Sequence, residues 1–273
     1  MKIFDCFMYF DEDILLDLRL NVLNDYVHKF IILEASEDHQ GNKRNLKFDI
    51  SKYEKFKNKI KYIPLEKINI DETIKLKKNW DKGHLRDQSM RNEIKNYLDE
   101  ADDNDLIIIS DLDEIPNPAK FREFKPKNKY AFFEQNFFYY KFNVLNTTQP
   151  KWYGSRICIK KYLKSPQWLR NIKIKKKSIL KKYLFNQNYQ VLIDGGWHFS
   201  NLKTPKELID KISSFCHGEF NKLEFKKEEI IKKKIENLED IFDRNVKYKK
   251  INLDKSFPDY LVKNKSKYLD WIL

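Results

Sequence analysis

The chain has 273 residues, of which 41% are hydrophobic and 15% aromatic, and its formal net charge is +13. This composition excludes an intrinsically disordered chain, and no run approaches the roughly 18 apolar residues of a membrane-spanning helix. The apolar start MKIFDCFMYF is interrupted by Asp5 and followed at once by DED, which does not match a signal peptide, so we expect a soluble, cytoplasmic protein.

Apolar runs and helical periods alternate along the first 110 residues. We predict strands at residues 2–10, 29–36, 59–65 and 105–110, and helices at residues 12–26 and 84–101. This succession is typical of an α/β fold with a mixed, mainly parallel sheet flanked by helices. In such sheets the ligand crevice lies outside the carboxyl ends of the strands. We expect a single domain over residues 1–273, with a mainly helical C-terminal part from about residue 200.

The three cysteines, Cys6, Cys158 and Cys216, are widely separated and match no CxxC pattern. Their spacing predicts buried free thiols rather than disulfides or a zinc site.

Lysine is dense in two segments, KKKSILKKYLF (residues 175–185) and KKEEIIKKKIENLEDIF (residues 226–242). These lysines either contact an anionic partner, such as nucleic acid, a lipid surface or a phosphorylated substrate, or they form solvated helix faces in a chain rich in Lys, Asn and Ile. In the first segment the lysines alternate with large apolar side chains. We therefore predict peripheral contact with an anionic membrane there.

Acidic residues follow the predicted strand at 105–110, in the stretch DLIIISDLDEIPNP. Asp111 and Asp113 can converge on one cation if the chain turns there, and Pro116 and Pro118 prevent a regular strand or helix from continuing. A hard divalent cation, Mn²⁺ or Mg²⁺, would remove the repulsion between the two carboxylates and leave positions open for phosphate oxygens. The alternative is a helix N-cap cluster, in which acids stabilise the start of a helix.

Seven segments, in order and spacing, resemble glycosyltransferase family 17, whose animal members are the β-1,4-mannosyl-glycoprotein β-1,4-N-acetylglucosaminyltransferases that add the bisecting residue to N-glycans. The segments are DCFMYFDE, with Arg19 in the helix that follows, FIILEAS, LRDQSMRNEI, IIISDLDEIPNP, WYGSRI, GGWHFSNL and FPDYLVKN. The resemblance implies a GT-A-type fold, a nucleotide-sugar donor, and a divalent metal held by Asp111 and Asp113, with Asp111 also at the donor.

Two further residues are expected close to that metal. Glu12 would face the same rim and accept a hydrogen bond from the nucleotide; the alternative is an acid at the start of a helix. His198 follows the predicted strand QVLI and two glycines, and would complete the coordination of the metal. A buried, hydrogen-bonded histidine next to Trp197 is the alternative.

Two segments offer further contacts to the substrates. Arg86, Asp87 and Arg91 lie along one side of the predicted helix 84–101, where they would bind the diphosphate and sugar of the donor; a surface ion-pair ladder is the alternative. The segment WYGSRI supplies a possible wall for the acceptor, against the alternative of a plain hydrophobic turn. Its side chains are Trp152, Tyr153, Ser155 and Arg156.

The resemblance implies inversion at the anomeric carbon, which needs a carboxylate that takes the proton of the attacking hydroxyl. Asp194, just before GGWH, is the first candidate and Glu134 the second. The expected function is transfer of N-acetylglucosamine from UDP-GlcNAc to a glycan or lipid-linked saccharide, in a bacterial or viral setting, with no nucleic-acid partner. The alternatives are a metal-dependent phosphodiesterase or nuclease, and a basic nucleic-acid-binding protein.

Overall fold

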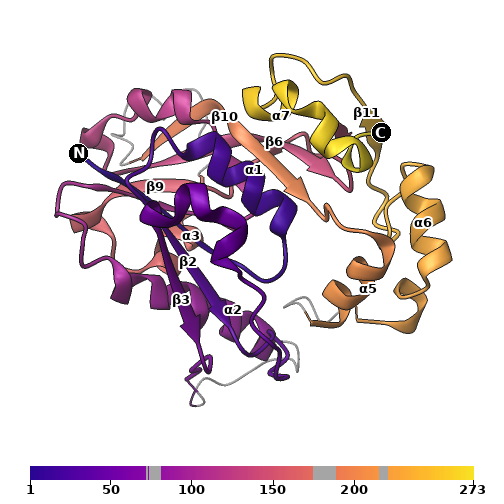
Figure 1. Ribbon diagram of the computed structural model, residues 1–273, viewed down its shortest axis with the longest axis horizontal. Helices are drawn as coiled ribbons and strands as arrows, with labels where there is room; N and C mark the ends of the chain where they lie inside the picture. Colours follow the sequence, from indigo (N-terminus) through magenta and orange to yellow (C-terminus); the bar gives the residue numbers. More distant parts are fainter. Residues whose placement is uncertain (72, 74–80, 175–188, 215–220) are drawn as a thin grey trace.

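Four parallel strands form one half of the central sheet in the computed structural model, which describes residues 1–71, 73, 81–174, 189–214 and 221–273 (Figure 1). They are β1 (Ile3–Met8), β2 (Lys29–Ala35), β3 (Ile60–Leu65) and β4 (Leu106–Ile109), in the spatial order β4-β1-β2-β3. Strand β4 is buried along its whole length, as its continuous apolar sequence requires. All six elements predicted in the first 110 residues are present.

Helices cover both faces of this parallel half. Helix α1 (Asp13–Leu23) packs its leucines against one face, in the same hydrophobic cluster as Phe7 and Ile108. Helix α2 (Asp81–Glu93) contributes Met90 to a second cluster on the opposite face, with Ile107 of β4. Side chains of a strand alternate between the two faces, so neighbours in β4 belong to different clusters. The mixed α/β architecture predicted from the sequence is confirmed.

The other half of the sheet is mixed. Its strands are β5 (Glu114–Pro116), β6 (Tyr130–Tyr139), β7 (Val144–Asn146), β8 (Lys151–Trp152), β9 (Arg156–Ile159), β10 (Tyr189–Ser200) and β11 (Tyr248–Lys250). Strand β9 pairs antiparallel with both β4 and β6 and joins the two halves, while the long strands β6 and β10 run parallel to each other. Short antiparallel strands β5 and β8 lie beside β10 and β6.

Helices dominate the chain after β10. They are α5 (Pro205–Ser214), α6 (Glu228–Glu236), α7 (Asp259–Lys263) and the 3-10 helices Leu223–Phe225 and Lys265–Trp271. Helices α5 and α6 pack on the aromatic end of β6 through a third hydrophobic cluster, and α7 lies beside α1 (Figure 1). The remaining helices are α3 (Pro166–Asn171) and the 3-10 helices Ile50–Lys59, Ile94–Tyr97, Pro118–Glu123, Pro126–Asn128 and Lys160–Tyr162.

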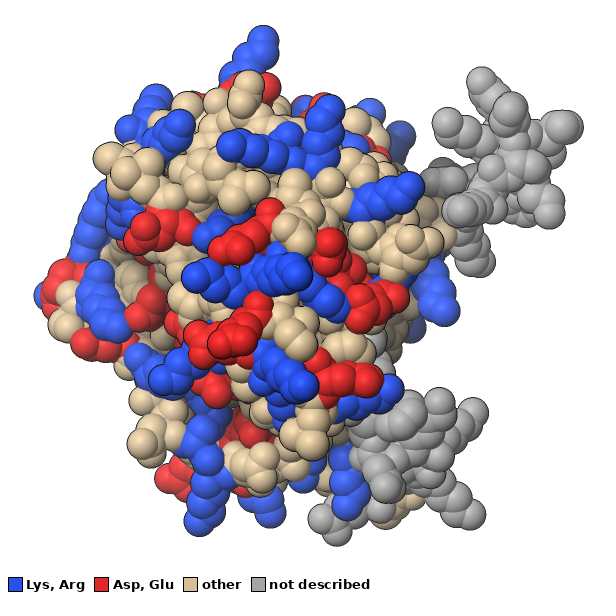
Figure 2. Space-filling view, turned by 90° about the vertical axis from the view of Figure 1, so that its right-hand side faces the viewer, with Lys and Arg blue, Asp and Glu red and all other residues tan. Residues whose placement is uncertain are grey.

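Of the predicted free thiols, Cys6 and Cys158 are buried and unpaired, and Cys216 lies outside the described residues. None of the described helices is long and apolar enough to cross a membrane. The lysine-rich segment 175–185 also lies outside the described residues. In the second lysine-rich segment, α6 buries Ile231 and Ile235 and turns its lysines outward, and Figure 2 shows basic and acidic side chains interspersed over this face of the molecule.

Candidate functional site

A cavity of about 500 Å³ opens at the carboxyl ends of β1, β2 and β4. We divide its lining residues by their position in the chain into two parts, which we call the N-terminal arm and the C-terminal arm. The N-terminal arm is lined by residues between 8 and 114, among them Phe10, His39 and Asp87. The C-terminal arm is lined by residues between 137 and 246, among them Trp152 and Arg244. Asp111, Asp113 and His198 also line the cavity.

The loop after β4 takes its shape from Arg19, which α1 projects beneath it. The Arg19 side chain is fully buried and forms a salt bridge with the buried Asp5 at 2.6 Å. Its guanidinium also donates to the backbone carbonyls of Asp111, Leu112 and Glu114, at 3.1, 3.1 and 2.8 Å. One buried arginine therefore fixes three backbone carbonyls of the loop that carries the acidic residues.

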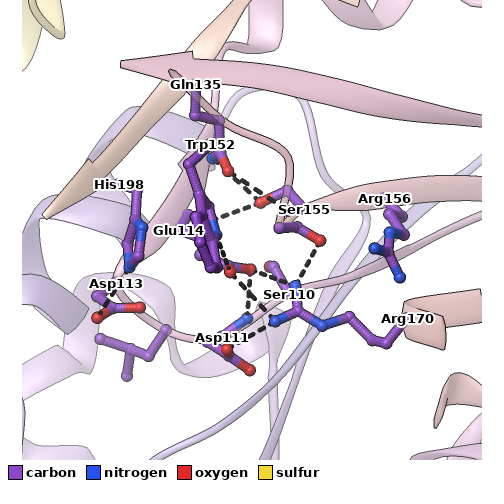
Figure 3. A network of polar contacts seen from close by, with 12 residues as sticks. Ser110, Asp111, Asp113, Glu114, Gln135, Trp152, Ser155, Arg156, Arg170 and His198 are labelled. Atoms are coloured by element: carbon purple, nitrogen blue, oxygen red, sulfur yellow. Dashed lines mark hydrogen bonds and ion pairs between the residues drawn. The ribbon is translucent and has the colours of Figure 1, made fainter. Parts of the chain in front are cut away.

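Asp111 is held by two arginines. Its Oδ1 accepts from Arg91 at 3.0 Å. Its Oδ2 accepts from Arg170 of α3 at 2.7 Å (Figure 3). Burial acts to raise the pKa of Asp111, but the charges of Arg170 and Arg91 outweigh it and hold the pKa well below its ordinary value. Arg170 also bonds the buried Glu114, which in turn accepts from the indole Nε1 of Trp152 at 2.6 Å.

Asp113 faces His198 instead. The antiparallel pairing of β5 with β10 sets His198 opposite Glu114, and Asp113 Oδ2 lies 3.4 Å from His198 Nε2. The imidazole stacks on the ring of Phe137, with centroids 4.5 Å apart, and its Nδ1 is buried without a hydrogen-bond partner among the described residues. Burial acts to raise the pKa of Asp113, but the nearby His198 and Lys211 outweigh it and lower the pKa.

Asp113 and His198 fit a hard divalent cation. A carboxylate oxygen and an imidazole nitrogen face each other at the cavity wall, and both are ligands for Mn²⁺ and, for the oxygen, Mg²⁺. No group of three or more His, Cys, Asp or Glu side chains suited to a metal occurs in the described part of the chain, so a cation here would take its other ligands from a bound substrate. Asp111 is less suited, because both its oxygens already accept from arginine.

Comparison with known proteins places the chain in a family. The sequence model of glycosyltransferase family 17 matches residues 1–268. The chain belongs to glycosyltransferase family 17. Among solved structures, the glycosyltransferase GlyE of Streptococcus pneumoniae TIGR4 is similar to this family 17 chain at 13% sequence identity and a TM-score of 0.33. The match covers 71% of this chain and 46% of GlyE, less than half of its length. No curated protein matches the chain.

The predicted donor residues of this family 17 member separate into two sets. Asp87 and Glu12 line the cavity. Asp87 is held by Arg91 through two bonds of 2.9 Å, and Glu12 accepts from the backbone of its own loop. Arg91 lies behind Asp87 and Asp111 and positions both. Arg86 points away, to the backbone carbonyl of His39 at 3.3 Å.

Of the four predicted acceptor residues, Trp152 alone lines the cavity. The fully buried Ser155 donates to the carbonyl of Glu114 at 2.8 Å, and Tyr153 donates to Glu134 at 2.8 Å. Arg156 donates to the carbonyl of Leu169 at 2.7 Å. These three side chains therefore bind other parts of the chain and do not line the cavity.

Neither of the two predicted general bases, Asp194 and Glu134, lines the cavity. Asp194 sits at an irregularity in β10 with a φ of 51°, and its side chain is 74% exposed beside Lys151, in a second groove. Glu134 is bound by Tyr153 and by Lys151, the latter at 3.3 Å. Sequence proximity to His198 was misleading, because the left-handed turn at Asp194 points that side chain outward.

Sequence reasoning missed Arg170, His39, Lys211 and Arg244. Arg170 belongs to the short helix α3 and has no motif around it, so no pattern predicts that it reaches Asp111. His39 lines the N-terminal arm, and its Nδ1 is buried without a partner among the described residues. Its place directly after β2, at a strand end, was the signal that could have revealed it.

Proposed function

We propose that this family 17 protein is a GT-A-type, metal-dependent, inverting glycosyltransferase. The donor proposed is UDP-GlcNAc and the acceptor a hydroxyl of a glycan or lipid-linked saccharide. The observation that carries the proposal is the pair Asp113 and His198. Asp113 Oδ2 and His198 Nε2 lie 3.4 Å apart in the wall of a cavity at the carboxyl ends of parallel strands. That is where a nucleotide diphosphate and its cation would be expected to lie in a sheet of this kind.

In this proposal the donor and the acceptor bind in different arms of the cavity. The nucleoside would occupy the N-terminal arm, between the ends of β1 and β2 and α2, where apolar Met8 and Met90 face the polar His39. Burial lowers the pKa of His39, so its imidazole is neutral and its Nδ1 can hydrogen-bond an uncharged base. The acceptor would enter by the C-terminal arm, where aromatic rings can pack on the apolar face of a sugar.

Asp113 and His198 would hold the cation, and Asp111 would be oriented beside it by Arg91 and Arg170. When bound, a divalent cation supplies positive charge that offsets the negative charge growing on the leaving diphosphate. The residues of the chain hold the site in place. Arg19 fixes the backbone of the loop after β4, and Arg170 fixes the carboxylates of Glu114 and Asp111. A preorganised arrangement of this kind costs no rearrangement during the reaction.

A panel of nucleotide sugars tests the proposal. Incubated with Mn²⁺, the protein is expected to hydrolyse UDP-GlcNAc slowly, and faster than it hydrolyses GDP-, CDP- or ADP-sugars. This hydrolysis should stop when EDTA is added. Hydrolysis of no nucleotide sugar, or hydrolysis that EDTA leaves unchanged, would refute it.

The two alternatives, a two-metal phosphodiesterase and a nucleic-acid binder, gain no support from the site. A pair of metal ions needs more carboxylates around one point than the described residues bring together.

A further inference from the structure

The charges that line the cavity are divided between its two arms. The N-terminal arm has one cation, Arg44, which is paired with the buried Glu34, and it holds all the acids of the lining. The acids are Glu12, Glu37, Asp38, Asp87, Asp111, Asp113 and Glu114. The described residues that line the C-terminal arm include no acid. They include two cations, Lys211 and Arg244, together with amides and aromatic rings. A neutral sugar needs no such positive surface, whereas an anionic one does.

Arg244 is held at the wall of this arm by a buried partner. The Asp240 side chain is 3% exposed and accepts from Arg244 Nε at 2.9 Å and from Nη2 at 2.8 Å. Tyr248 donates to the same carboxylate at 3.2 Å, and the guanidinium lies 5.0 Å from the ring centre of Phe242. The bidentate pairing raises the pKa of Arg244 and fixes the plane of its guanidinium. Its position is therefore set before any ligand arrives.

Lys211 lies on the last turn of α5 and lines the same arm. The described residues provide it with no ion pair, and its charge acts on Asp113 across the cavity. An ammonium that lines a cavity and has no ion-pair partner among the described residues is placed to bind an anion that enters from solution. Lys211 comes from α5 and Arg244 from the segment before β11. The positive surface of this arm is therefore formed by two separate elements and not by a single side chain.

Resting on the proposed function, we propose that the acceptor is an anionic saccharide whose phosphate or carboxylate group binds between Lys211 and Arg244. Its sugar ring would then pack on the aromatic side chains of the C-terminal arm, where Trp152 and Phe137 contact the ring of His198. The anion anchors the acceptor at one end, and the hydroxyl that receives the new sugar lies at the other. The two cations are binding residues that set the class of acceptor.

The test measures binding of matched acceptor probes to the full chain saturated with UDP and Mn²⁺. N-acetylglucosamine 1-phosphate is compared with neutral methyl N-acetylglucosaminide, and glucuronic acid with glucose, so that phosphate and carboxylate are distinguished. The wild type is expected to bind at least one anionic probe about tenfold or more tighter than its neutral partner, because each charge-assisted contact is worth about ten- to a hundredfold. The variant Lys211→Gln should lose most of this preference.

Lys206→Gln is the matched control, since Lys206 is an exposed lysine of the same helix that does not line the cavity. Arg244→Gln alone would leave Asp240 buried without its partner, so the double variant Asp240→Asn, Arg244→Gln removes both charges, with its melting temperature as the check of folding. It should also lose the preference for the anion. Equal binding of anionic and neutral probes by the wild type, or a preference that survives Lys211→Gln, would overturn the inference.

Titration of UDP with Mn²⁺ on the same samples separates the two proposals. If the wild type binds no UDP, the proposed function fails. If it binds UDP and yet treats charged and neutral probes alike, only the acceptor inference fails. If Lys211→Gln weakens UDP binding as much as probe binding, Lys211 serves the donor diphosphate and the inference is also wrong.

Discussion

Among the three acids that follow β4, Asp113 has the fewest structural partners. Asp111 is bound by two arginines, and Glu114 is buried between Arg170 and Trp152. Asp113 faces only His198 in the described structure, and its side chain is 19% exposed. The three carboxylates therefore differ in what they do: two hold the loop together, and the third remains available to a ligand.

Replacing Asp113 with alanine is expected to abolish sugar transfer, a loss of about 10²-fold or more, because a preorganised charge at the reacting centre is removed. Folding should be little affected, since the change relieves repulsion from Asp111 and deletes a single partly exposed contact. Transfer from the donor found in the nucleotide-sugar panel, together with thermal unfolding, measures both effects. Full activity in this variant would show that the cation, if any, binds elsewhere.

Asp194→Asn gives the opposite expectation and serves as the matched carboxylate control. Its exposed side chain lies in a different groove from Asp113, so the variant should transfer sugar at close to the wild-type rate and bind UDP normally. Steady-state kinetics with varied donor and acceptor measure this. A large fall in kcat with unchanged KM values would show that Asp194 takes part in the reaction, and it would contradict the placement of this side chain outside the cavity.

At the scale of elements, the buried pair of Arg19 and Asp5 joins α1 to β1, and Arg19 also bonds the backbone of the loop after β4. Arg19→Met should lower the free energy of unfolding by about 3–5 kcal/mol, because it leaves the Asp5 charge buried and unpaired. Urea unfolding measures the loss. Lys52→Met, which removes the exposed pair between Lys52 and Asp13, should change stability little. Equal effects of the two variants would contradict the role assigned to Arg19.

The parallel half of the fold could be predicted because each element there carries its own periodic signal, as the buried run of β4 and the leucines of α1 do. Motifs and strand ends also indicated Asp113 and His198, which lie together in the cavity wall, and their role as metal ligands stays a prediction. That Ser155 and Arg156 lie outside the cavity lining could not be predicted, because a short segment does not reveal which way its side chains point. Arg170 was missed because its contact with Asp111 spans 59 residues and depends on how α3 packs.

At the scale of the whole molecule, the cavity lies between two parts of the chain with different tasks. The acids that line it come from the first 114 residues, whereas Lys211, Arg244 and most of its aromatic rings come from residues 137–246. Strand β9 joins the two halves through its pairing with β4 and β6. A ligand that fills the cavity contacts both halves at once and should stabilise them together.

Thermal unfolding tests this coupling. UDP and Mn²⁺ at about 100 times their dissociation constant should add about 2.7 kcal/mol to the stability of the folded state, because they bind it and not the unfolded chain. For a protein of this size that corresponds to a rise of several degrees in Tm, at roughly 2–4 °C per kcal/mol. UDP alone should shift Tm less than UDP with Mn²⁺, and Asp113→Ala should remove the difference between them. A difference that persists in Asp113→Ala would mean that the cation binds without this carboxylate, and the site would have to be sought among other oxygen ligands of the cavity.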